Sequence, residues 1–131
     1  METRPYFVLG DLFANSLAGV LVGLAVAALF GPGWNMILAM FVGMALGMVV
    51  SLPVALPLGA LFGAMEVMIP VMTTGMVTGM VVSMSATMAT MAEPLSLGRG
   101  AALGLYCGLG TLAACYVANL WIRGRTSRWT A

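Results

Sequence analysis

Long apolar stretches, separated by short polar or helix-breaking turns, organise the whole chain. The first stretch runs from Tyr6 to Phe30, and the triplet Gly31-Pro32-Gly33 that follows it breaks a helix before the next stretch starts at Trp34. Stretches of about 20 apolar residues have the length of membrane-spanning helices. The pattern predicts an all-α fold, a polytopic transmembrane helical bundle in one integral membrane domain, with four spans at residues 6–30, 34–54, 66–91 and 100–122.

Prolines set the expected end of the second span. Pro53 and Pro57 cannot donate a backbone hydrogen bond, so we predict that the helix ends within residues 52–56. The apolar piece that follows, residues 53–64, is too short to cross a bilayer and too apolar for an ordinary loop. It is predicted to form an interfacial or re-entrant turn.

Composition supports the membrane assignment and removes several function classes. The chain is 62% hydrophobic and 7% charged, whereas a soluble domain carries roughly a quarter charged residues. A net charge of +1 without lysine or histidine offers no basic surface for nucleic acid. No nucleophile, P-loop or paired-carboxylate motif is present, and we predict that the protein is not an enzyme.

Arginines give the expected orientation, because cytoplasmic loops of membrane proteins are enriched in them. Arg4 precedes the first span, Arg99 precedes the fourth, and Arg123, Arg125 and Arg128 follow it. Four spans then place both termini in the cytoplasm, and we predict an integral protein of a bacterial inner membrane.

An internal duplication marks the second and third spans. The segment Met36 to Ser51 reappears thirty-two residues later as Met68 to Ser83, with ten of sixteen positions identical. This offset leaves room for one connection and no further crossing, so the copies are predicted to run antiparallel as an inverted repeat. Such repeats often place binding groups at a pseudo-two-fold axis near the midplane of the bilayer.

In both copies a methionine recurs at every fourth position, directly after the glycines of a GxxxG pair. These glycines are Gly43 and Gly47 in one copy and Gly75 and Gly79 in the other. Glycine grooves let helix backbones approach closely, and a four-residue ridge that enters such a groove favours a crossing angle of roughly −40 to −50°. We therefore predict that the copies interlock, ridge into groove, and gather their central methionines.

Thioether sulfur is a soft ligand that prefers Cu(I) or Ag(I) to Mg, Ca or Zn, and as a neutral group it is inexpensive to bury. We predict that the protein binds or transports a soft monovalent metal such as Cu(I). The expected central ligands are Met44, Met48, Met76 and Met80, extended along the spiral by Met40, Met72 and Met84. The alternative stays open that methionine, a flexible side chain that fills irregular gaps, only packs the helix interface.

Isolated motifs resemble elements of the Ctr-type copper transporters, whose second span carries MxxxM and whose third carries GxxxG. The matching positions here are Met36 with Met40, Met72 with Met76, and Gly100 with Gly104. The resemblance implies copper transport. The chain departs from the family in having four predicted spans rather than three, and in lacking a methionine-rich extramembrane tail.

The remaining residues of interest are carboxylates, glycines and cysteines in the first, third and fourth spans. Asp11 lies inside the first span and Glu66 opens the third, so they form either an ion-paired cluster or a mouth that attracts a cation. The fourth span carries the close-packing pattern Gly100, Gly104 and Gly108, which favours packing within the chain, a homo-oligomer or a larger membrane complex. Cys107 and Cys115 are eight residues apart and are expected to be apolar fillers.

A second function, from a different class, follows from the same glycines. In it the protein is a non-catalytic accessory subunit that packs through its GxxxG faces onto a larger membrane complex and needs no metal.

Overall fold

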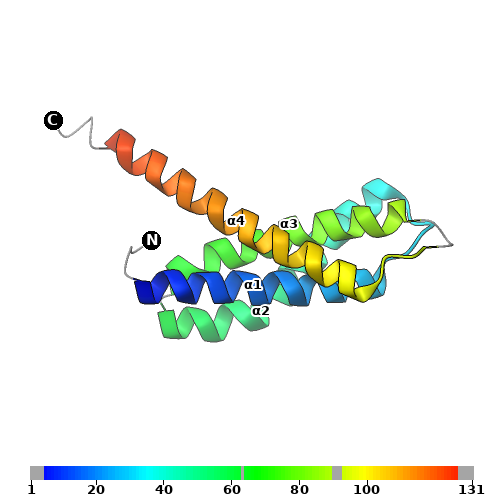
Figure 1. Cartoon of the computed structure of the whole chain (residues 1–131), viewed down its shortest axis with the longest axis horizontal. Helices are drawn as coiled ribbons and strands as arrows, with labels where there is room; N and C mark the ends of the chain where they lie inside the picture. The colour runs from blue at the N-terminus through cyan, green and yellow to red at the C-terminus, as the bar shows by residue number, and fades with distance from the viewer. Residues whose placement is uncertain (1–4, 63, 90–92, 127–131) are drawn as a thin grey trace.

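Four α-helices make up the protein in the computed structural model, which describes residues 5–62, 64–89 and 93–126. They are α1 (Pro5–Leu29), α2 (Met36–Phe62), α3 (Ala64–Met88) and α4 (Leu97–Thr126) (Figure 1). Each contains a stretch long and apolar enough to cross a membrane, at Val8–Leu29, Met36–Leu61, Val67–Met88 and Leu97–Ile122. The predicted all-α class and the four spans are confirmed, and the chain is a small four-helix membrane protein.

The helix ends follow from local residues. Gly33 adopts φ +106°, a value that glycine tolerates, and turns the chain after α1. Asn35 caps α2, because its side-chain oxygen accepts a hydrogen bond from the N–H of Ile37 at 3.1 Å. Ser96 caps α4 in the same way, accepting from the N–H of Arg99 at 3.3 Å.

The prediction that the second span ends near Pro53 is wrong. α2 continues through Pro53 and Pro57 to Phe62, and residues 53–62 form neither a re-entrant nor an interfacial turn. Packing accounts for this continuation: Val54 and Ala55, just beyond the first proline, are buried in a cluster shared with α1 and α3. Burial of that face offsets the hydrogen bonds that the prolines remove from the helix.

Two pairs of helices make up the bundle. α2 packs mainly against α3, and α1 mainly against α4, while α1 also contacts both α2 and α3. Within the ranges that the structure describes, α2 and α4 make no contact. α4 crosses the other helices obliquely, and its C-terminal half extends away from them (Figure 1).

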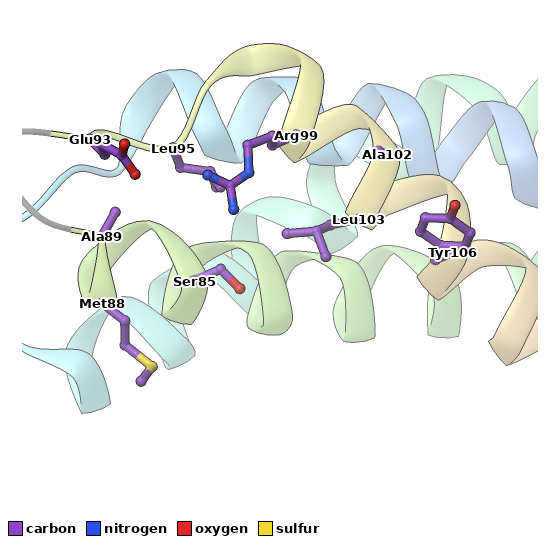
Figure 2. A pocket seen from close by; sticks show the side chains of 9 residues that line it. All are labelled: Ser85, Met88, Ala89, Glu93, Leu95, Arg99, Ala102, Leu103 and Tyr106. Carbon is purple, nitrogen blue, oxygen red and sulfur yellow. The ribbon is translucent and has the colours of Figure 1, made fainter.

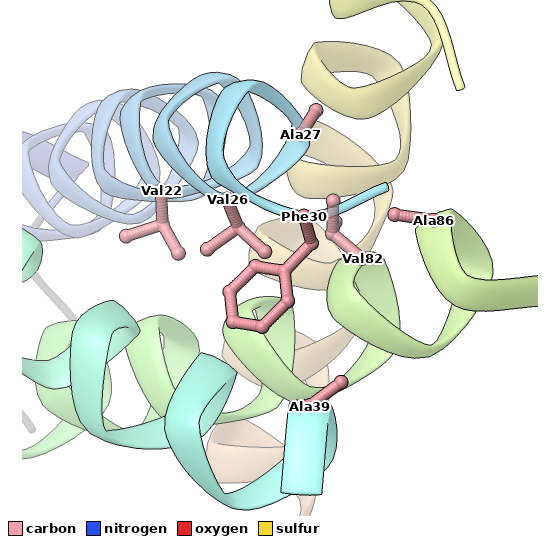
Figure 3. Close-up of a cluster of buried hydrophobic side chains, with 7 residues drawn as sticks. All are labelled: Val22, Val26, Ala27, Phe30, Ala39, Val82 and Ala86. Atoms are coloured by element: carbon pink, nitrogen blue, oxygen red, sulfur yellow. The ribbon is translucent and has the colours of Figure 1, made fainter. Parts of the chain in front are cut away.

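Small side chains fill the interior. One cluster gathers the ends of α1 and α3 with the start of α2 around the ring of Phe30 (Figure 3), and its other members are Val22, Val26, Ala27, Ala39, Val82 and Ala86. A second cluster joins α1, α2 and α3 nearer the other end, through Ala14, Ala18, Val54, Ala55, Val67 and Val71. A core of valine and alanine lets the four helices lie close together.

Candidate functional site

Glycines on the duplicated segments bring α2 and α3 into backbone contact. Gly43 faces Gly79 and Gly47 faces Gly75, so the two helices run antiparallel. A Cβ atom built on Gly75 would lie 2.5 Å from the carbonyl oxygen of Gly47 and 2.7 Å from the Oγ of Ser51. No residue larger than glycine fits there unless the helices move apart.

The same close contact between glycines joins α1 to α4. Gly19 meets Gly104, and Gly23 meets Gly100, with a carbonyl oxygen of the opposite helix where a Cβ would stand. A Cβ on Gly108 would lie 2.5 Å from the carbonyl oxygen of Asn15. The glycines singled out in the sequence all lie at these two contacts, and they are Gly43, Gly47, Gly75, Gly79, Gly100, Gly104 and Gly108.

Methionine does not enter the glycine grooves, which corrects the expected ridge-into-groove fit. The atoms nearest to Gly43 and Gly47 belong to Gly75, Gly79 and Ser83 of the opposite helix. The physical reason is the closeness of the two backbones, which leaves no volume for a longer side chain. The methionines consequently lie beside the contact rather than inside it.

The four central methionines are partly covered. Met44, Met76 and Met80 are half-buried, and Met48 is 41% exposed. The three outer positions of the predicted site, Met40, Met72 and Met84, are half-buried as well. The Met72 sulfur accepts a hydrogen bond from the Ser51 Oγ at 3.5 Å, which ties one thioether to the contact between α2 and α3.

The register of the glycines fixes the order of the methionines along this contact. A Cβ on Gly47 would lie between the backbones of Gly75 and Gly79, 3.2 Å from the Cα of Gly79, so Gly47 is level with the middle of the opposite glycine pair. This register places Met44 level with Met80 and Met48 level with Met76, and the two levels are four residues, about 6 Å, apart in height.

These methionines occupy one side of the α2–α3 pair. At 100° per residue, Met44 and Met76 lie about 100° around their helices from Gly43 and Gly75, in the direction that leads away from the α1 contact. α1 packs on the other side, where the partly buried Leu46 and Val50 of α2 join its cluster. The methionines therefore form a seam that α1 leaves uncovered. We call Met40, Met44, Met48, Met72, Met76, Met80 and Met84 the methionine seam.

Asp11 and Glu66 are the two carboxylates predicted to attract a cation. Asp11 is 5% exposed, and its Oδ2 lies 3.5 Å from the phenol oxygen of Tyr116, which donates a hydrogen bond from α4. The side chain of Glu66 lies outside the described residues, as do Arg4 and Arg128. Asp11 is thus held inside the α1–α4 contact rather than at an open surface.

A buried polar contact, absent from the sequence-based site, links α1 to α3. Thr74 donates its hydroxyl hydrogen to the Oδ1 of Asn15 at 2.6 Å, and Asn15 donates its amide to the carbonyl oxygen of Asp11 at 2.9 Å. Thr78, one turn beyond Thr74, is also fully buried. The sequence gives one indication of this contact, since the two copies differ here. Thr74 and Thr78 stand in the second copy where the first copy has Val42 and Leu46.

Both cysteines are half-buried and free. They line an apolar groove of about 560 Å³ between α3 and α4, together with small residues of α4 such as Gly110 and Ala114. Among the described residues, no three His, Cys, Asp or Glu side chains gather in a way that could hold a metal ion. Any soft-metal site in this part of the chain would therefore depend on methionine sulfur.

Comparison with other proteins adds no relative: no family model matches the chain, and neither a curated protein nor a solved structure gives a match.

Proposed function

We propose that the methionine seam binds a soft monovalent metal such as Cu(I), or passes it across the membrane. The observation that carries this proposal is the glycine register, which places Met44 level with Met80 and Met48 level with Met76 along one side of α2 and α3, with about 6 Å between the two levels. Each level offers one thioether from each helix, and an ion that leaves one pair finds the next pair about 6 Å farther along. Neutral sulfur also holds a cation without the cost of burying charged ligands in hydrocarbon.

Two-fold organisation supports the same proposal. We infer that the duplicated segments of α2 and α3 form an inverted repeat, since each presents its GxxxG pair to the other in antiparallel register. In such a repeat equivalent positions, Met44 with Met76 and Met48 with Met80, contribute equal ligands from both sides of the axis. Because the seam is open on one side, a further ligand could come from a neighbouring methionine or from a second copy of the chain.

Metal binding to the purified protein in detergent tests the proposal. Cu(I) or Ag(I) is added under reducing conditions, and bound metal is measured for wild type and for the variant with Met44, Met48, Met76 and Met80 all changed to leucine. We expect the metal to be lost in this variant alone. The matched control changes three exposed methionines outside the seam, Met36, Met68 and Met88, to leucine. Equal binding by wild type and the seam variant would contradict the proposal.

A second function, the accessory subunit, has its own supporting observation. The C-terminal half of α4 extends away from the bundle (Figure 1) and exposes Val117, Leu120, Trp121 and Ile122. In a membrane this surface is available to lipid or to another transmembrane helix. Mild extraction from native membranes tests this reading, which requires a larger partner recovered in fixed stoichiometry. Isolation of a stable homo-oligomer alone would count against it.

We further propose that both termini face the cytoplasm, since Arg123 and Arg125 lie in the last turns of α4, at the end of the bundle where α1 starts (Figure 1). Labelling of a single cysteine introduced at either terminus, in intact cells and in inverted vesicles, tests this orientation.

A further inference from the structure

A cavity of about 600 Å³ lies between the C-terminal end of α3 and the N-terminal part of α4 (Figure 2). None of the seam methionines lines it, and it belongs to no part of the proposed metal function. Its walls combine two charged side chains, Glu93 and Arg99, with the apolar side chains of Leu95 and Leu103. A cavity with both properties suits a ligand that is itself amphiphilic.

The ends of the membrane spans fix the depth of this cavity. The span in α3 ends at Met88 and the span in α4 starts at Leu97, and residues next to both ends line the cavity. It therefore lies where the hydrocarbon of the bilayer gives way to the lipid headgroups. Tyr106, nine residues beyond Leu97, also lines the cavity, which therefore extends about 13 Å into the span.

The two charges approach the cavity from different sides. The Arg99 guanidinium extends from α4 into the space in front of α3, and the Glu93 carboxylate faces the same space from the segment before α4 (Figure 2). The backbone N–H of Arg99 donates to the Oγ of Ser96, which fixes the residue in the first turn of α4. The cavity thus presents one cationic and one anionic group at headgroup depth.

We propose that this cavity binds the headgroup of a zwitterionic phospholipid that carries a primary ammonium, the phosphatidylethanolamine type. Its phosphate pairs with Arg99, whose planar guanidinium donates parallel hydrogen bonds to phosphate oxygens. Its ammonium pairs with Glu93, which accepts hydrogen bonds from the three N–H groups. Leu95 and Leu103 then cover the apolar part of the lipid that begins below the phosphate.

The neighbouring groove fits the rest of such a lipid. Farther along the same two helices, the apolar groove of about 560 Å³ is lined by Thr73 and Val77 of α3 and by Gly110 and Ala114 of α4. Gly110 is eleven residues beyond Arg99, which corresponds to about 16 Å along the helix. An acyl chain that descends from a headgroup at Arg99 therefore reaches this groove within the bilayer.

Native mass spectrometry of the detergent-purified protein tests the proposal, with phosphatidylethanolamine and phosphatidylglycerol of identical acyl chains added in turn. We expect wild type to retain phosphatidylethanolamine preferentially. Arg99→Gln should weaken retention of both lipids about tenfold, since one charge-assisted contact to phosphate is lost. Glu93→Gln should weaken retention of phosphatidylethanolamine alone, because phosphatidylglycerol has no ammonium.

Two further variants separate the cavity from general effects of charge and folding. Ala102→Trp fills the cavity while both charges stay in place, and it should reduce retention of both lipids. Arg125→Gln removes one arginine from the last turn of α4 and should change neither. Equal retention of the two lipids, unaffected by Arg99→Gln and Glu93→Gln, would overturn the proposal. Displacement of the lipid by inorganic phosphate alone would also overturn it, because the site would then take a free anion.

Discussion

The two copies of the duplicated segment share ten of sixteen residues but have different surroundings. Of an 18-residue apolar stretch within each membrane span, 50% is buried inside the bundle in α3, whereas the value is 28% in α2. α3 contacts all three other helices, while α2 contacts only α1 and α3 within the described ranges. One sequence pattern therefore serves both a central and a peripheral helix.

Shared and divergent positions separate two kinds of packing. The shared glycines and serines form the contact between the copies, so each position has an equivalent partner across it. The divergent positions face other surroundings: Val42 of the first copy is exposed, and its counterpart Thr74 is fully buried against Asn15 of α1. Identity is kept at the glycines and serines where the copies touch each other, and it is lost at this position, where α1 contacts the second copy alone.

The largest expected effect concerns the shared glycines. Gly47→Ala and Gly79→Ala each place a Cβ against a backbone carbonyl of the opposite copy, so the helices must separate. We expect each variant to lose about 3 kcal/mol of unfolding free energy, and the two losses to be equal. Unfolding in detergent micelles, followed by circular dichroism during titration with a denaturing detergent, measures the loss.

Gly110→Ala is the control for this prediction, because nothing lies within 4 Å of a Cβ at Gly110. Alanine there should stabilise the helix by up to about 1 kcal/mol through its higher helix propensity. A loss at Gly110 as large as that at Gly79 would contradict the prediction, because the cost of alanine would then not depend on the contact between the copies.

The next effect tests whether the copies are equivalent in metal binding. Met44→Leu and Met76→Leu remove thioethers at corresponding positions of the seam, and each should weaken Cu(I) binding about tenfold, or about 1.4 kcal/mol. Competition with a Cu(I) chelator measures the affinity, and Met88→Leu at the exposed end of α3 is the control. Strongly unequal losses would contradict an equal contribution of the two copies.

Much of the fold could be predicted from the sequence. The number of spans and the antiparallel meeting of the two copies follow from apolar length and from the thirty-two-residue offset. The end of the second span could not be predicted, because the local cost of Pro53 competes with the burial of Val54 and Ala55 against other helices. A local rule contains no information about that burial.

The candidate site was predicted less completely, for a geometric reason. Residue spacing places the methionines next to the glycine groove but does not say whether the groove admits them, since this depends on how closely the two backbones approach. The contact between Asn15 and Thr74 was missed because it joins segments 59 residues apart. A comparison of the copies position by position would have marked Thr74 and Thr78 as adapted to a different neighbour.

A smaller effect concerns a divergent position. Thr74→Val removes the hydroxyl that donates to Asn15 at 2.6 Å and leaves a buried amide oxygen without this partner. We expect a loss of about 1 kcal/mol in unfolding free energy, within the range of hydrogen bonds between membrane helices. The matched change in the other copy, Val42→Thr, lies on an exposed position and should change the stability little. An equal effect of the two changes would contradict the difference in surroundings.

The smallest effect should have the opposite sign. Thr78 is fully buried, and in the described part of the chain its Oγ1 has no hydrogen-bond partner, although its β-branched shape fits the contact. Valine has almost the same shape and lacks the hydroxyl, so Thr78→Val should raise the unfolding free energy by roughly 0.5 kcal/mol. Measurement of Thr78→Val and Thr74→Val together compares two threonines that lie one turn apart on the same helix. A loss of stability in both variants would mean that the Thr78 hydroxyl forms a hydrogen bond in the membrane, and that the divergence of the second copy added two polar contacts rather than one.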